Sequence, residues 1–84
     1  MQKIWYVYII QTVSGKLYTG ITTDTERRFN EHLSGKGGAK FFRSDPAHKM
    51  VYVEKMKNRS LASKREAAIK CLSRIKKMEL ISKF

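Results

Sequence analysis

The stretch IWYVYIIQTVSGKLYTGIT, residues 4–22, decides the fold of this chain. Two of its segments are rich in β-branched and aromatic side chains, residues 4–11 and 16–21. Segments of this kind joined by a serine and a glycine predict a β-hairpin. A three-residue loop ending at Gly15 pairs Ile10 with Tyr18 and places Tyr18 on the same face as Tyr8. A two-residue loop would put the two tyrosines on opposite faces, and we expect the three-residue loop.

A helix is expected directly after this hairpin, over residues 25 to 33 or 34. The Thr23 side chain is suited to cap it, and Glu26, three residues later, completes a capping-box pattern. The stripe expected to face the core consists of Phe29 and Leu33, and the neighbouring stripe of Arg28 and His32.

The second half of the chain predicts a helix, a strand and a longer helix. Residues 39–44 suggest a short helix that ends before Pro46, and the alternating pattern of residues 49–55 predicts a third strand. A long helix is expected from about residue 60, with Ser60 as its N-cap and residues 78–84 as a further turn or a frayed end. Its buried stripe is expected to be Leu61, Ala68, Leu72 and Ile75, and Cys71 is expected to be a reduced core residue.

The predicted fold is therefore a single α+β domain over residues 1–84, with helices packed on a small three-stranded sheet in the order β-β-α-α-β-α. The longest apolar run, residues 4–10, is far shorter than the roughly 20 residues of a membrane span. We expect a protein of the cytoplasm with no membrane contact.

The charge of the chain indicates a polyanionic partner. Its 84 residues include 18 Lys and Arg but only 7 Asp and Glu, a formal net charge of +11. Nucleic acid is favoured over a membrane surface, because no segment combines clean basic and apolar faces. The residues expected to contact nucleic acid are Gly20, Arg27, Lys36, Lys40, Arg43 and Lys70.

Individual residues leave several interpretations open. Glu66 flanks the buried face of its helix, where it either pairs with a neighbouring cation or holds a hard cation such as Mg²⁺ beside a phosphate. Arg27 and Arg28 follow a strand-to-helix junction, where at least one should reach an anion bound at the helix start. The GKGG of residues 35–38 fits either a flexible loop or the GxxG of a KH domain that binds RNA.

Taken in order, several motifs resemble the GIY-YIG nuclease family and its small stand-alone bacterial branch. Tyr6-Val7-Tyr8 is followed, after nine residues, by Tyr18-Thr19-Gly20. Arg28 comes eight residues after the glycine, and His32 and Glu66 complete the pattern. The resemblance spans nearly the whole chain and implies the fold of that family.

What the resemblance implies is hydrolysis of phosphodiester bonds with one divalent ion, Mg²⁺ or Mn²⁺. Glu66 would anchor the ion, Tyr18 would activate the attacking water, and Arg28 would bind the scissile phosphate. Tyr8 would orient the site, and His32 would assist by hydrogen bonding or proton transfer. DNA is the expected substrate, RNA the alternative, and a partner protein could deliver the domain to it.

The sequence also departs from the family pattern. Tyr6 replaces a glycine and Thr19 an isoleucine, both of which the family tolerates. Ile21 stands where excision-repair relatives have a lysine, and Met78 where several relatives have an asparagine. The alternative function is therefore a binding module without catalysis, either a degenerate nuclease or a KH-like RNA binder.

Overall fold

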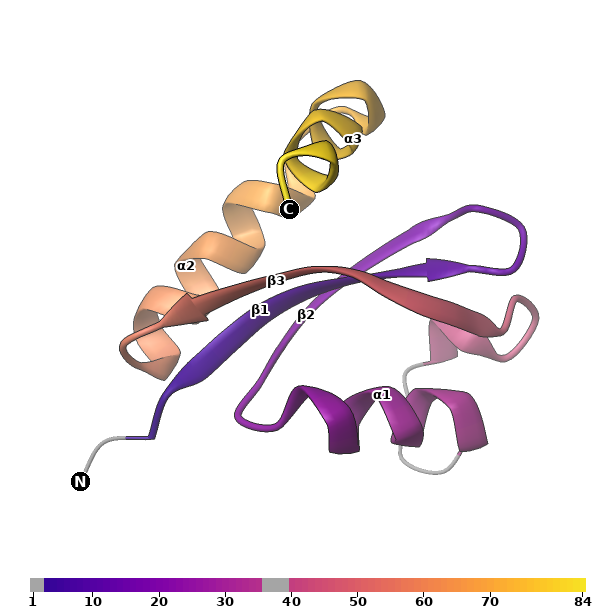
Figure 1. Ribbon diagram of the computed structural model, residues 1–84, viewed down its shortest axis with the longest axis horizontal. Helices are drawn as coiled ribbons and strands as arrows, with labels where there is room; N and C mark the ends of the chain where they lie inside the picture. Colours follow the sequence, from indigo (N-terminus) through magenta and orange to yellow (C-terminus); the bar gives the residue numbers. More distant parts are fainter. Residues whose placement is uncertain (1–2, 36–39) are drawn as a thin grey trace.

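A computed structural model describes residues 3–35 and 40–84 as a three-stranded sheet with helices on both faces (Figure 1). Its elements are β1 (Trp5–Thr12), β2 (Leu17–Thr22), α1 (Thr25–Ser34), the 3₁₀ helix η1 (Lys40–Phe42), β3 (Ala47–Met56), α2 (Arg59–Lys70) and α3 (Arg74–Ser82). The α+β class and the three-stranded sheet are confirmed. The helix expected over residues 39–44 is the single turn η1, and the expected last helix is divided into α2 and α3.

The sheet has the strand order β2-β1-β3, and both pairings are antiparallel. The central strand β1 is apolar along its length because both of its faces are covered. Val7 and Ile9 pack with the α2 residues Ala62 and Ile69 on one face. Tyr8 and Ile10 pack on the other face, which α1 and η1 cover (Figure 1). The sheet therefore separates α2 and α3 from α1, and residues alternate between the two layers.

The hairpin register is the predicted one. Ile10 pairs with Tyr18, and the Thr12 amide donates to the Lys16 carbonyl at 2.9 Å. Gly15 adopts φ 97°, a left-handed conformation that side-chain-bearing residues rarely adopt. The turn is also tied to the segment before β3, because Thr12 Oγ1 donates to Asp45 Oδ2 at 2.7 Å. This register places the two tyrosines on the face covered by α1.

Helix α1 differs from the prediction in its cap and in its buried face. Asp24 rather than Thr23 is the N-cap, and its Oδ1 accepts from the Arg27 amide at 3.0 Å. A carboxylate also suits the positive end of the helix dipole. Phe29 packs against the core as predicted, but Leu33 is 52% exposed and His32, 3% exposed, is the buried residue. A polar ring is tolerated there because it is hydrogen-bonded.

The C-terminal helices also differ from the prediction. Asn58 rather than Ser60 caps α2, and its Oδ1 accepts from the Leu61 amide at 2.9 Å. The buried residues of α2 are Ala62 and Ile69, which lie two turns apart. The residues wrongly predicted to be buried are Leu61, Ala68, Cys71 and Ile75, all of which are exposed.

Within α2 the expected stripe was wrong by one residue, because Ala62 and Ile69 rather than Leu61 and Ala68 are buried. At Ile75 it was wrong because it assumed one continuous helix. The chain leaves α2 at Cys71, and Ser73 starts α3 by accepting from the Lys76 amide at 3.2 Å. The break rotates the following residues relative to α2, so Leu80 and Ile81 rather than Ile75 pack against the core.

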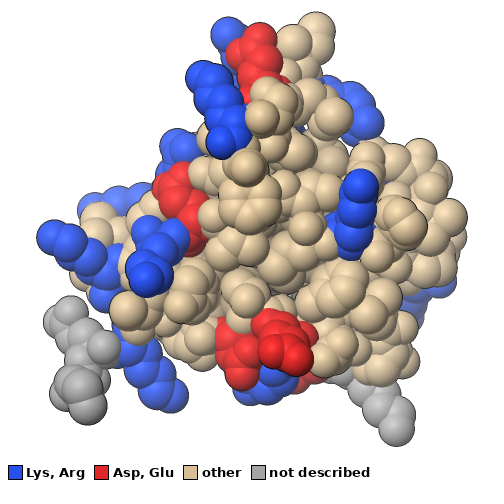
Figure 2. Space-filling view, in the orientation of Figure 1, with Lys and Arg blue, Asp and Glu red and all other residues tan. Residues whose placement is uncertain are grey.

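Figure 2 shows the charged side chains on one face of the molecule. On the face shown in Figure 2, most Lys and Arg side chains lie around the rim, and the middle is largely uncharged. No helix within residues 3–35 and 40–84 is both long and apolar enough to cross a membrane.

Candidate active site

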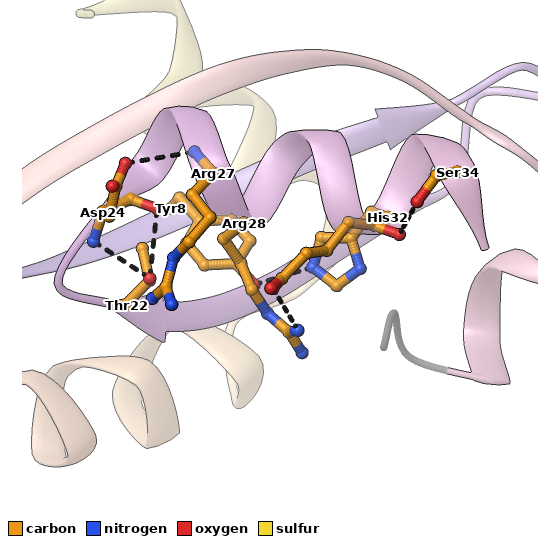
Figure 3. Close-up of polar contacts among 8 residues, drawn as sticks. Tyr8, Thr22, Asp24, Arg27, Arg28, His32 and Ser34 are labelled. Atoms are coloured by element: carbon orange, nitrogen blue, oxygen red, sulfur yellow. Dashed lines mark hydrogen bonds and ion pairs between the residues drawn. The ribbon is translucent and has the colours of Figure 1, made fainter. Parts of the chain in front are cut away.

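Three of the predicted site residues form an aromatic cluster between the sheet and α1. Tyr8 comes from β1, Tyr18 from β2 and His32 from α1. The ring centroids of Tyr8 and Tyr18 are 6.4 Å apart, those of Tyr8 and His32 6.0 Å, and those of Tyr18 and His32 5.5 Å. Figure 3 shows Arg28 on the same side of α1 as His32, one turn earlier. The structure thus brings together four of the five predicted catalytic residues.

The cluster depends on the absence of a side chain at Gly20. Gly20 is the cross-strand partner of Tyr8, and a Cβ built on it would lie 2.5 Å from the Tyr8 Oη and 2.6 Å from its Cζ. Any side chain at this position would therefore displace the Tyr8 ring. The structure gives Gly20 this packing role, and its contact with nucleic acid stays a prediction.

Tyr8 and His32 form a buried hydrogen bond between two neutral groups. The Tyr8 Oη and the His32 Nε2 lie 2.9 Å apart. Burial raises the pKa of Tyr8 to about 12, although a hydrogen bond with Arg28 opposes this shift. Burial, helped by the positive charge of Arg28, lowers the pKa of His32 to about 4. At neutral pH the pair therefore holds its position without net charge, which suits an orienting role for Tyr8.

Arg28 lies at the border between the buried cluster and solvent. Its Nη1 contacts the Glu31 Oε1 at 3.0 Å, and 27% of its side chain is exposed. The sequence analysis missed Glu31, although its spacing of three residues from Arg28 on a helix predicts such a pair. A phosphate that binds Arg28 must share the guanidinium with this carboxylate or replace it.

Glu66 approaches from the opposite layer of the sheet. It lies on α2, its Oε2 is 3.4 Å from the Lys70 Nζ, and 23% of its side chain is exposed. Its negative charge is one of the influences that raise the pKa of Tyr8, so the carboxylate lies within electrostatic range of the cluster. The fifth predicted catalytic residue therefore interacts electrostatically with Tyr8, and it belongs to another element.

Glu66 is the carboxylate of this site that a metal ion could use. No three His, Cys, Asp or Glu side chains in the described ranges are grouped closely enough to bind a metal ion. Mg²⁺ and Mn²⁺ prefer oxygen ligands, and Mg²⁺ is often held by one carboxylate with water and substrate phosphate. A partly exposed carboxylate such as Glu66 fits that requirement.

A basic pocket of about 340 Å³ adjoins Arg28. It is lined by Arg27, Arg28 and Arg59, together with Trp5, Ile21 and other residues. Arg59, which the sequence analysis missed, lies over the Trp5 ring with its Cζ 5.7 Å from the centroid. Arg59 comes from α2 and Arg27 from α1, so no local pattern could show that they share a pocket.

The other residues predicted to contact nucleic acid are dispersed. Lys40 and Arg43 are exposed in and beside η1, and Lys70 is exposed at the end of α2. Lys36 and most of the GKGG segment lie outside the described residues. Within that segment, Gly35 ends α1 with φ 76°.

Comparisons with known proteins agree with this geometry. Residues 4–79 match the family described as the GIY-YIG catalytic domain. A UPF0213 protein of Desulfotalea psychrophila is 51% identical over 77 residues, which cover 92% of this chain and 70% of the relative. A UPF0213 protein of Pseudomonas aeruginosa is 48% identical over 79 residues, which cover 94% of this chain and 75% of the relative. The UPF0213 protein YhbQ of Escherichia coli is 44% identical over 78 residues, which cover 93% of this chain and 77% of the relative.

Two solution NMR structures are also similar. A UPF0213 protein of Bacillus halodurans has a TM-score of 0.59 and 38% identity, covering 94% of this chain and 83% of that one. A protein of E. faecalis has a TM-score of 0.65 and 38% identity, covering 99% and 88%.

Proposed function

This chain belongs to the GIY-YIG family, and from that premise we propose that it is an endonuclease that cuts phosphodiester bonds in DNA with one Mg²⁺ or Mn²⁺ ion. The observation that carries the proposal is the convergence of Tyr8, Tyr18 and His32, with Arg28 beside them, from three separate elements. The proposal includes a cytoplasmic location and, for delivery to DNA, a partner protein.

In this proposal the two tyrosines have different roles because their hydroxyls differ. The Tyr8 hydroxyl is buried and bonded to His32. The Tyr18 hydroxyl has no hydrogen bond to any residue in the described ranges, and the residue is only partly buried. Tyr18 is therefore the group that takes a proton from the attacking water, while Tyr8 and His32 keep the ring cluster in place.

In this proposal, positive charge supports the attack of water and stabilises the charge that develops on the phosphate. A phenol accepts a proton only as its phenolate, which is scarce at neutral pH, so Tyr18 can act as the base only where cations close to its oxygen stabilise the phenolate. Arg28 supplies such charge from α1 and also binds the phosphate on which negative charge develops. Glu66 would hold the divalent ion, which when bound supplies Lewis-acid stabilisation of the phosphate oxygens.

Nicking of supercoiled plasmid by the purified chain tests the proposal. Wild type with Mg²⁺ or Mn²⁺ is expected to produce open-circular DNA, and a chelator is expected to stop it. Tyr18→Phe should lower the nicking rate by about 100-fold or more, the usual contribution of general base catalysis. Glu66→Gln should abolish nicking, whereas Glu79→Gln should not, although Glu79 also pairs with a lysine on its helix, at 3.6 Å. Nicking that survives Glu66→Gln would overturn the metal role.

A second candidate function is a binding module without catalysis. The observation that favours it is Ile21, an apolar residue that lines the pocket beside Arg28. A protein that binds DNA with strong salt dependence, but never nicks it with either metal, would favour this candidate.

A further inference from the structure

A second basic pocket is lined by residues of the β1–β2 turn, η1 and α3 and lies at the start of β2, whereas the Arg28 pocket lies at its end. Its volume is about 280 Å³. It is lined by Lys16, Leu17, Phe41, Arg74 and Lys77. Figure 1 shows the hairpin turn and η1 at the same end of the molecule. The turn and α3 are fixed to each other, since the Arg74 Nη2 donates to the Gly15 carbonyl at 3.0 Å.

The lining of this pocket is cationic. Three of its five residues are Lys or Arg, and none is acidic. In the described part of the chain, none of these three cations forms an ion pair within 4.0 Å of a carboxylate. Asp45, the acid that interacts with Lys16 over a longer distance, is held by hydrogen bonds from Ser14 and Thr12. The charge of the pocket is therefore available to an anion.

An exposed aromatic ring forms the wall of the pocket nearest the candidate active site. Phe41 is 40% exposed, whereas its neighbour Phe42 is 7% exposed. The Phe41 ring centroid lies 5.3 Å from that of Tyr18 and 5.4 Å from that of Phe42. Phe41 thus extends the active-site ring cluster into the basic pocket, and its exposed ring surface is available to a planar group.

We propose that this pocket binds one unpaired nucleotide of the DNA strand that is cut, with its base stacked on Phe41 and its phosphates bound by Lys16, Arg74 and Lys77. Aromatic rings in basic grooves bind single-stranded nucleic acid in this way, because every base has a stacking face. A base inside a duplex has both faces covered by its neighbours, so the nucleotide must be unpaired. The inference rests on the proposed function only in placing this nucleotide next to the phosphate cut at Tyr18.

Binding of short single-stranded DNA that carries 2-aminopurine tests the pocket without cleavage. The full chain is titrated in chelator, and affinity and fluorescence quenching are both measured. Phe41→Leu should weaken binding about fivefold or more and reduce quenching, because the ring is lost while apolar volume is kept. Phe41→Tyr should keep both the affinity and the quenching of wild type. Phe84→Leu is the matched control, since Phe84 is 68% exposed and lies outside the pocket.

Two adjacent lysines of α3 test the phosphate contacts. Lys77 lines the pocket, whereas Lys76 pairs with Glu79 at 3.6 Å. Lys77→Gln should reduce the slope of log affinity against log salt by about 0.7, the value for one phosphate of a single strand. Lys76→Gln removes the same charge and should change the slope less. These lysine variants and Phe41→Tyr keep the test valid if Phe41→Leu fails to fold.

The outcomes separate this inference from the proposed function. Equal binding by wild type and Phe41→Leu, or equal losses in Phe41→Leu and Phe84→Leu, would overturn the nucleotide pocket even if plasmid is nicked. The nucleotide pocket would also be overturned if Phe41→Leu weakened binding to blunt duplex DNA as much as binding to single-stranded DNA. The expected pattern in a protein that never nicks DNA would support the pocket and reject the endonuclease.

Discussion

His32 should make the stability of the protein depend on pH between neutrality and pH 4. The ring is 3% exposed, and its pKa is lowered from 6.5 to about 4, chiefly by burial. The unfolded chain therefore binds a proton at higher pH than the folded chain does. The contribution of the neutral His32 ring to the free energy of unfolding is complete above pH 6.5 and is lost as the pH falls from 6.5 to about 4.

The loss of unfolding free energy follows from the shift in the pKa of His32. At 1.36 kcal/mol for each pKa unit, a change from 6.5 to about 4 corresponds to about 3 kcal/mol of unfolding free energy. For a domain of this size, that loss lowers the melting temperature by roughly 12–24 °C. The loss is large chiefly because the ring is buried, and the positive charge of Arg28 adds to it by repelling the protonated ring.

Urea unfolding of wild type, His32→Gln and His48→Gln at several pH values between 7.5 and 4 measures the effect. Glutamine keeps a polar partner for the Tyr8 hydroxyl but does not titrate, so the difference between wild type and His32→Gln should shrink steadily as the pH falls. His48 is exposed on β3, and its variant should follow wild type. If His32→Gln loses stability in parallel with wild type over this range, the ring is not held neutral in the core.

Three other perturbations have expected outcomes. Gly20→Ala should destabilise the fold by about 1–3 kcal/mol in urea unfolding and lower nicking, because its Cβ would lie 2.5 Å from the Tyr8 Oη; an unchanged nicking rate would contradict this. Hydrogen bonds from Ser14 and Thr12 lower the pKa of Asp45, so Asp45→Asn should be less stable than wild type at neutral pH, and the difference should shrink as the pH falls below about 4. A difference that grows in acid would refute that reasoning. Lys70→Ala removes the partner 3.4 Å from the Glu66 carboxylate, so Mg²⁺ titrations of nicking should show a half-saturating concentration up to about fivefold lower. A higher concentration would show that Lys70 assists the metal instead.

Local sequence patterns were sufficient for the hairpin and for part of the site. Gly15 and the loop length determine the register, and the register alone places Tyr8 and Tyr18 on one face. The spacing of four residues between Arg28 and His32 then places both on one side of α1. These inferences held because each depends on residues that are close in the chain.

Features that depend on distant partners were not predicted. The burial of His32 needs the Tyr8 hydroxyl, which lies 24 residues away in the chain. The role of Asp45 in tying down the hairpin turn depends on Thr12, 33 residues away. A pattern of polar and apolar residues contains no information about such pairs, so it assigned His32 to a partly polar stripe and Leu33 to the core.

The position of Glu66 explains why the proposed chemistry requires both layers of the fold. The tyrosines, Arg28 and His32 belong to the layer of α1, whereas Glu66 belongs to α2 on the other face of the sheet. The helix turn that carries Glu66 is anchored by its neighbour Arg65, whose Nε donates to the Glu54 Oε1 on β3 at 3.0 Å. Packing of α2 on the sheet thus sets the distance between the carboxylate and the ring cluster. Without α2 packed on the sheet, the residues in the layer of α1 would lack the carboxylate that we propose holds the metal ion.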